Sequence, residues 1–123
     1  MSESKRDRDR ATEAFRRWAR AGCPGPDQIR DGKGAEDLRA CVAVFAVLGH
    51  SQQRRANFPG YEIERAVREV YMADPGRKLR KSELSGRVRR VAFCLCADER
   101  TVYRWLCAAR RMWAEFRGKT CQY

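Results

Sequence analysis

Hydrophobic side chains recur at spacings of three and four residues in several stretches of the chain, which predicts an all-α protein of about five helices. Residues 1–10 alternate charges and hold no apolar anchor, so we expect a flexible basic and acidic lead-in there. A first helix follows and ends before Gly22 and Pro24, which are typical of a helix stop. Its apolar face consists of Ala11, Phe15, Trp18 and Ala19.

The longest apolar run, Cys41–Leu48, fits either a buried helix or a buried strand by its periodicity. We interpret it as part of a helix that starts at Ala35, because a strand needs a partner strand and no other segment is similarly rich in β-branched residues. The preceding stretch, Cys23–Gly34, holds two prolines and three glycines and is expected to be a loop. Residues 11–60 therefore form an N-terminal helical region.

Three further helical patterns occupy residues 61–117. The first ends at Asp74-Pro75-Gly76, since proline disfavours helix in the residue before it. The second begins at Ser82, a good N-cap, and only residues 96–98 separate it from the third. So short a connection makes two helices cross steeply, as in a helix-turn-helix. We expect residues 61–117 to form a tri-helical helix-turn-helix unit, followed by a tail at 118–123.

The last of these helices has two opposed faces when its residues are placed 100° apart. One face is apolar and predicts a core contact; it consists of Val102, Leu106, Ala109, Trp113 and Phe116. The opposite face is basic and consists of Arg100, Arg104, Cys107 and Arg111. Asp98 precedes the helix and can accept hydrogen bonds from its first free amides. A helix that is packed from behind and carries arginines outside has the shape and charge to enter the DNA major groove.

The charge balance supports a polyanionic partner. The 123 residues include 27 Lys and Arg against 16 Asp and Glu, a net charge of +11, which attracts nucleic acid. No apolar run reaches the length needed to cross a bilayer, and no segment has the pattern of a secretory signal. We therefore expect a cytoplasmic protein without a membrane partner, whose six cysteines are mostly reduced thiols.

The first turns of the last helix are predicted to read bases. Arg100 and Arg104 can donate to guanine O6 and N7. Thr101 can reach a base or a phosphate, whereas Glu99 can accept from cytosine N4 or complement the helix dipole. Phosphate contacts, which position a protein without reading sequence, are predicted for Arg80, Lys81, Arg87, Arg90 and Arg111.

The stretch Val91–Leu106, with the sequence VAFCLCADERTVYRWL, resembles the helix-turn-helix of bacterial and phage transcription regulators. It is similar in particular to sigma-factor region four and to sigma-like late regulators of phages, and the continuation Ala108–Trp113 also looks like that group. The resemblance covers residues 61–117 and implies DNA binding through the last helix. Cys96 stands where many relatives have a glycine that accepts a left-handed backbone.

Catalytic motifs are missing from the sequence: it has no glycine-rich phosphate loop, no Ser-His-Asp arrangement and no His-Glu-x-x-His. We expect a non-enzymatic protein without a cofactor. Zinc bound by Cys94, Cys96, Cys107 and Cys121 is a weak alternative, because one residue between Cys94 and Cys96 is too tight for a structural zinc pair. The prediction is therefore no metal.

These observations favour a sequence-specific double-stranded DNA-binding protein, a transcription regulator of phage or prophage type. We expect a homodimer on repeated half-sites that associates through Cys41–Leu48 together with Trp113 and Phe116. One alternative is a small-terminase-like phage DNA-packaging protein, which assembles into rings. Another is a protein-interaction module that binds RNA polymerase or an acidic partner.

Overall fold

The computed structural model describes residues 3–54 and 58–121, with the side chains of 3–49 and 58–118. Every regular element in these ranges is helical, so the all-α prediction is confirmed. A short 3-10 turn lies at Pro26–Gln28, and a π-helical turn at Arg68–Met72 extends the third helix. The five α-helices are α1 (Lys5–Arg20), α2 (Ala35–Arg54), α3 (Gly60–Val67), α4 (Lys81–Cys94) and α5 (Glu99–Cys121).

Helix α1 begins at Lys5, so residues 5–10 of the expected flexible lead-in are helical. Ser4 is the N-cap, and its hydroxyl accepts a hydrogen bond from the amide of Asp7 at 3.1 Å. Such a cap satisfies one of the free amides of the first turn and allows a helix to start without an apolar anchor. The helix ends as predicted, with Gly22 in the left-handed region at φ 84°.

The apolar run in α2 is helical, as predicted, and one face of it packs into the core. Cys41, Val44 and Leu48 are fully buried, and burial raises the pKa of the Cys41 thiol. The ring of Phe45 packs on Trp18 of α1 with 5.0 Å between ring centroids. Trp113 of α5 is 3% exposed. The buried side chains of this run and Trp113 are used within one chain, so of the expected association surface Ala46, Val47 and part of Phe116 remain accessible.

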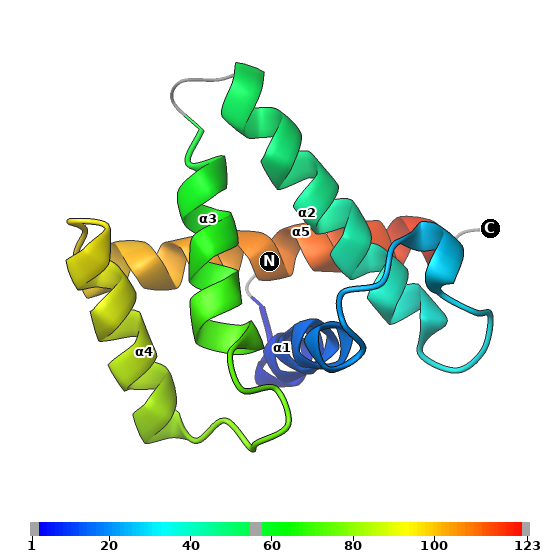
Figure 1. The fold of residues 1–123 in the computed structure, drawn as a ribbon, viewed down its shortest axis with the longest axis horizontal. Helices are drawn as coiled ribbons and strands as arrows, with labels where there is room; N and C mark the ends of the chain where they lie inside the picture. Colours follow the sequence, from blue (N-terminus) through cyan, green and yellow to red (C-terminus); the bar gives the residue numbers. More distant parts are fainter. Residues whose placement is uncertain (1–2, 55–57, 122–123) are drawn as a thin grey trace.

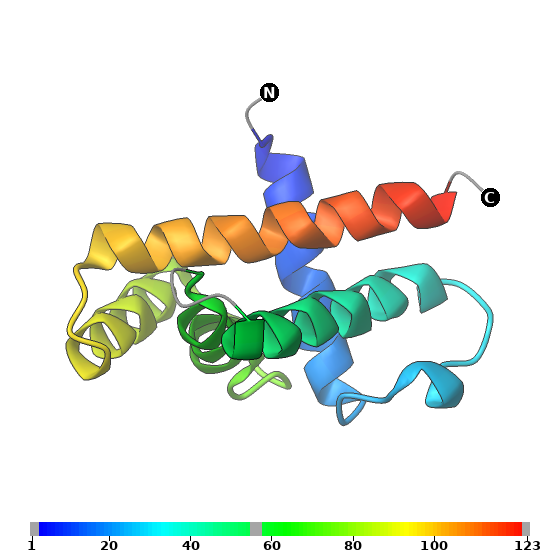
Figure 2. The same ribbon diagram turned by 90° about the horizontal axis from the view of Figure 1, so that it is seen from above.

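All five helices share a single core. Helix α5 runs behind α2 and α3 along the length of the molecule (Figure 1), and α2 packs against both. Helix α1 crosses α5, and its N-terminal end projects past α5 on the side away from α2 and α3 (Figure 2). The N-terminal helices α1 and α2 therefore pack on the 61–117 segment.

The connection between α4 and α5 is a tight turn. Cys96 has φ 53°, a left-handed conformation, and the amide of Ala97 donates to the carbonyl of Ala92 at 2.9 Å. Asp98 accepts from the amide of Thr101 at 2.7 Å and is the predicted N-cap of α5. This hydrogen bond lowers the pKa of the Asp98 carboxyl. The two helices cross steeply instead of lying antiparallel (Figures 1 and 2).

Two predicted helix boundaries are wrong by a few residues. Helix α4 begins at Lys81, with Arg80 rather than Ser82 as its N-cap, because the amide of Leu84 donates to the carbonyl of Arg80 at 2.9 Å. Helix α5 continues to Cys121, so residues 118–121 of the expected tail are helical. Residues 122–123 of that tail lie outside the described residues.

Candidate nucleic-acid interface

The two predicted faces of α5 are present in the structure. Val102, Leu106 and Ala109 are at most 1% exposed and pack into the core. Trp113 lies on the same face, and its indole nitrogen donates to the carbonyl of Asp37 at 3.0 Å. Phe116 completes the face and is half-buried. Because this face is held by α2, α3 and α4, the opposite face of α5 has a fixed orientation.

The four residues predicted to read bases lie together on the first two turns of α5. Glu99, Arg100 and Arg104 are exposed, and Thr101 is half-buried. Neither Arg100 nor Arg104 forms an ion pair within the described part of the chain. The Glu99 carboxylate lies 3.9 Å from the guanidinium of Arg89, and both side chains are at least half exposed. Such an exposed pair is weak and leaves Glu99 accessible.

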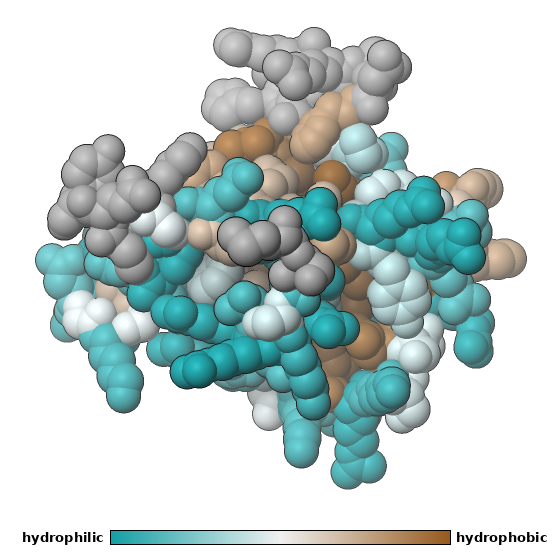
Figure 3. All heavy atoms as spheres, turned by 180° about the vertical axis from the view of Figure 1, so that it is seen from behind, coloured by the Kyte–Doolittle hydropathy of each residue, from teal (hydrophilic) through white to brown (hydrophobic). Residues whose placement is uncertain are grey.

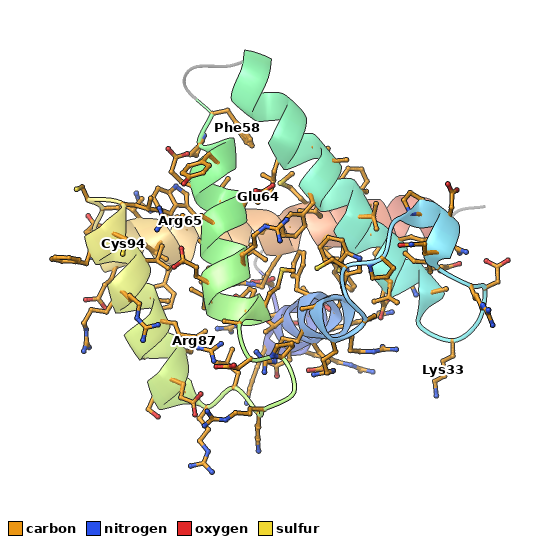
Figure 4. All side chains as sticks on the ribbon, viewed as in Figure 1. Lys33, Phe58, Glu64, Arg65, Arg87 and Cys94 are labelled. Carbon is orange, nitrogen blue, oxygen red and sulfur yellow. The ribbon has the colours of Figure 1, made fainter. Side chains whose placement is uncertain are left out.

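Arg87 is bonded within the chain, which argues against the predicted phosphate contact. Its guanidinium donates to the carbonyls of Val70 and Ala73 at 2.9 and 3.0 Å, and its side chain is 11% exposed. Figure 4 shows the side chain between α4 and the C-terminal end of the π-helical turn. Arg87 therefore holds the start of α4 to the preceding segment. A helical wheel of α4 does not reveal this contact, because the acceptors lie on another segment.

The other predicted phosphate ligands differ in their surroundings. Arg80, Lys81 and Arg90 are exposed and form no ion pair within the described ranges. Arg111 is also exposed, but it shares a hollow with the acidic residues Glu3 and Asp7 of the N-terminal end of α1. The outer face of α5 is therefore accessible over its first turns and bordered by α1 further along. Arg111 therefore lies in more acidic surroundings than Arg100 and Arg104.

Sequence reasoning missed Arg16, which is 4% exposed inside α1. Its guanidinium donates to the carbonyl of Tyr71 at 2.7 Å, to that of Asp74 at 3.2 Å and to that of Arg77. Burial and the neighbouring Arg87 lower the pKa of Arg16. In the sequence, the only sign of its burial was that Arg16 directly follows Phe15, a residue of the first apolar face. Arg16 and Arg87 together fix the segment that leads into α4.

In residues 3–49 and 58–118, no three His, Cys, Asp or Glu side chains come together to hold a metal ion. Of the cysteines considered for zinc, Cys94 and Cys96 are exposed and Cys107 is half-buried, whereas the side chain of Cys121 lies outside the described residues. No described helix has the length and hydropathy to cross a membrane.

Comparison of the chain with protein-family models, with curated proteins and with solved structures finds no match. The functional interpretation therefore rests on the geometry and charge of the residues themselves.

Proposed function

We propose that the protein binds double-stranded DNA sequence-specifically, with α4 and α5 acting as a helix-turn-helix and α5 entering the major groove. The observation that carries this proposal is the pair Arg100 and Arg104, which are exposed, form no ion pair with any described residue and lie opposite the buried Val102 and Leu106. The resemblance to sigma-factor region four and sigma-like phage late regulators supports a role in transcription control of phage or prophage type.

The spacing of the two arginines suits base reading. Residues four apart on a helix lie on one side and about 6 Å apart along the axis, since each residue rises about 1.5 Å. Successive bases are spaced about 3.4 Å along the duplex, so Arg100 and Arg104 reach bases about two steps apart. Each arginine offers paired donors that match guanine O6 and N7. Thr101 and Glu99 supply further contacts from the same turns.

Positioning contacts come from α4 in this proposal. Arg80 and Lys81 lie at its N-terminal end and Arg90 on its exposed side, where each can bind a phosphate. Phosphate contacts add affinity without sequence preference and fix the orientation of α5 in the groove. Arg87 is not in this set because its guanidinium is bonded to backbone carbonyls, and Arg111 is not because it shares a hollow with Glu3 and Asp7.

The proposal is tested by titrating the protein with duplex DNA at several salt concentrations and by selecting binding sites from random oligonucleotides. If four to six phosphates are neutralised, the slope of log affinity against log salt is about −4 to −5. Selection then yields a motif with guanines at the positions that the arginines reach. A protein that binds no duplex at low salt, or that selects no motif, contradicts sequence-specific DNA binding.

Oligomeric state separates the regulator from the packaging protein. A regulator of this type binds as a homodimer on repeated half-sites. A complex whose mass corresponds to two chains and one duplex supports it. A ring of many subunits favours the small-terminase-like alternative. Light scattering after size-exclusion chromatography, with and without the selected duplex, distinguishes the two. Most of the apolar run of α2 packs inside the chain, and only Ala46 and Val47 of it are exposed to a second copy.

A second candidate function is contact with a protein partner such as RNA polymerase or an acidic protein. Phe93 favours it, because this large apolar side chain at the C-terminal end of α4 is 85% exposed. Binding of purified RNA polymerase by wild type and by Phe93→Ala tests it, with DNA affinity measured alongside. Polymerase binding that is lost in Phe93→Ala at unchanged DNA affinity supports this contact, and equal binding by both proteins contradicts it.

A further inference from the structure

A second basic surface lies beside α1 and reaches the N-terminal end of α4. It is a groove of about 790 Å³ between α1 and the segment 76–81 that leads into α4. Seven basic side chains line it against two acidic ones, Asp9 and Glu13. Glu13 is already paired with Arg20 at 2.5 Å, which leaves a large excess of positive charge. None of the base-reading residues of α5 belongs to this groove.

One wall of the groove is a single face of α1. Lys5, Arg8, Thr12 and Arg16 follow one another at three- and four-residue steps, so they lie on one side of the helix. Lys5 and Arg8 are exposed, and neither forms an ion pair within the described residues. The early start of α1 at Lys5 creates this wall.

The opposite wall is held in place by two arginines of α1, the buried Arg16 and the exposed Arg20. Arg16 donates to the carbonyl of Arg77 within this segment and to that of Asp74 just before it, and Arg20 donates to the carbonyl of Pro75 at 2.7 Å. These bonds hold the segment against α1 and fix the width of the groove. Lys78 and Lys81 line this wall, are exposed and lack ion pairs among the described residues.

A second hollow of about 710 Å³ provides a comparison, because it also lies beside α1. Its four arginines face the carboxylates of Glu3, Asp7 and Glu115, and Arg110 is bonded to both carboxylate oxygens of Glu3 at 3.0 Å. Charge is nearly balanced there, so this hollow does not attract a polyanion. The groove between α1 and residues 76–81 has instead four unpaired cationic side chains, two on each wall.

The location of the groove relates it to the proposed DNA interface. Lys81 belongs both to the groove and to the N-terminal end of α4. The N-terminal end of α1 projects past α5 (Figure 2). Seen from behind, the molecule shows hydrophilic side chains over most of its surface, around a strip of hydrophobic atoms (Figure 3). A duplex that meets α5 from this side lies next to α1.

We propose that this groove binds the phosphodiester backbone of the same duplex, on the flank of the site that α5 reads. The inference rests on the proposed DNA binding and extends its contact surface to α1. Phosphates are recognised through Lys5 and Arg8 on one wall and Lys78 and Lys81 on the other, without reading bases. The binding site on DNA is therefore longer than the stretch that α5 covers.

The test compares Lys5→Ala/Arg8→Ala with the control Arg6→Ala/Arg30→Ala, which removes the same charge from exposed positions outside the groove. Both variants and wild type are titrated at several salt concentrations with the selected motif alone and with the motif inside longer flanks. On the longer duplex, the groove variant reduces the salt slope by about 2, since each lost phosphate contact removes about 0.9. On the motif alone, Lys5→Ala/Arg8→Ala has the wild-type salt slope. The control Arg6→Ala/Arg30→Ala keeps the wild-type slope on both duplexes.

A second variant addresses the other wall. Lys78→Ala reduces the slope on the longer duplex by about 1. Thermal unfolding of each variant is measured alongside, and we expect wild-type Tm values because the substituted side chains are exposed. Wild-type slopes in both groove variants, or an equal loss in the control, overturn the groove assignment. The assignment is also overturned if the groove variants lose affinity only for an RNA of the same length, titrated in parallel, and not for the DNA duplex.

The two proposals fail in distinguishable ways. If wild type binds the duplex with a base preference that depends on Arg104, while the groove variants keep its salt slope, only the groove assignment is wrong. If wild type binds no duplex at low salt, both are wrong.

Discussion

Replacing Arg87 with alanine tests whether this arginine serves the fold or the ligand. The substitution removes two hydrogen bonds from a charged donor to the carbonyls of Val70 and Ala73, in a side chain that is 11% exposed. Hydrogen bonds of charged groups contribute about 1.5–3 kcal/mol each, and partial access of water to the carbonyls reduces their sum. We expect the free energy of unfolding to fall by about 2–4 kcal/mol. At about 4 °C per kcal/mol for a domain of this size, Tm falls by roughly 8–16 °C.

Arg90→Ala is the matched control, because Arg90 lies three residues further along α4 and is exposed. We expect a change of at most about 0.5 kcal/mol in its unfolding free energy, together with a salt slope reduced by about 1. Urea unfolding and DNA titration of both variants measure the two effects. If Arg87→Ala unfolds like wild type and lowers DNA affinity as Arg90→Ala does, Arg87 contacts phosphate and the reasoning is refuted.

Three further predictions concern α5 and its turn. Leu106→Ala lowers the unfolding free energy by about 2–5 kcal/mol in urea titration, because Leu106 is 1% exposed; a value near zero contradicts the core assignment. Asp98→Ala lowers Tm at pH 7. The pKa of Asp98 is lowered in the folded state, so its ionised carboxylate stabilises the fold above the pKa of the unfolded state, and this stabilisation is lost as the pH falls through the pKa of the folded state. The Tm values of the variant and of wild type therefore converge in acid. A Tm difference that stays constant with pH disproves the cap. Cys96→Gly retains or raises stability, whereas Cys96→Val costs about 1–2 kcal/mol at φ 53°; equal denaturation midpoints rule out the left-handed turn.

Local patterns were sufficient to predict the helices of the proposed interface. The opposed faces of α5, the cap at Asp98 and the turn at Cys96 follow from the 3.6-residue period and from the short link, both of which are local properties. The helical state of Cys41–Leu48 was also predicted correctly, from the lack of a partner strand.

Tertiary contacts explain what the sequence did not reveal. Arg87 was placed on the surface because its acceptors at Val70 and Ala73 lie on another segment, and arginine is seldom buried. The early start of α1 depends on one hydroxyl of Ser4 rather than on an apolar face. The groove between α1 and residues 76–81 joins segments about 70 residues apart, which no local pattern indicates.

The central claim is that the exposed first turns of α5 read bases. Its most direct test is the base preference at each position of the selected site, measured for wild type, Arg104→Ala and Arg90→Ala. Loss of a bidentate contact costs about 1–3 kcal/mol, so we expect Arg104→Ala to bind about 5- to 150-fold more weakly and to lose preference at one position, while Arg90→Ala weakens all sequences equally. An Arg104→Ala protein that keeps the wild-type preference at every position contradicts the account.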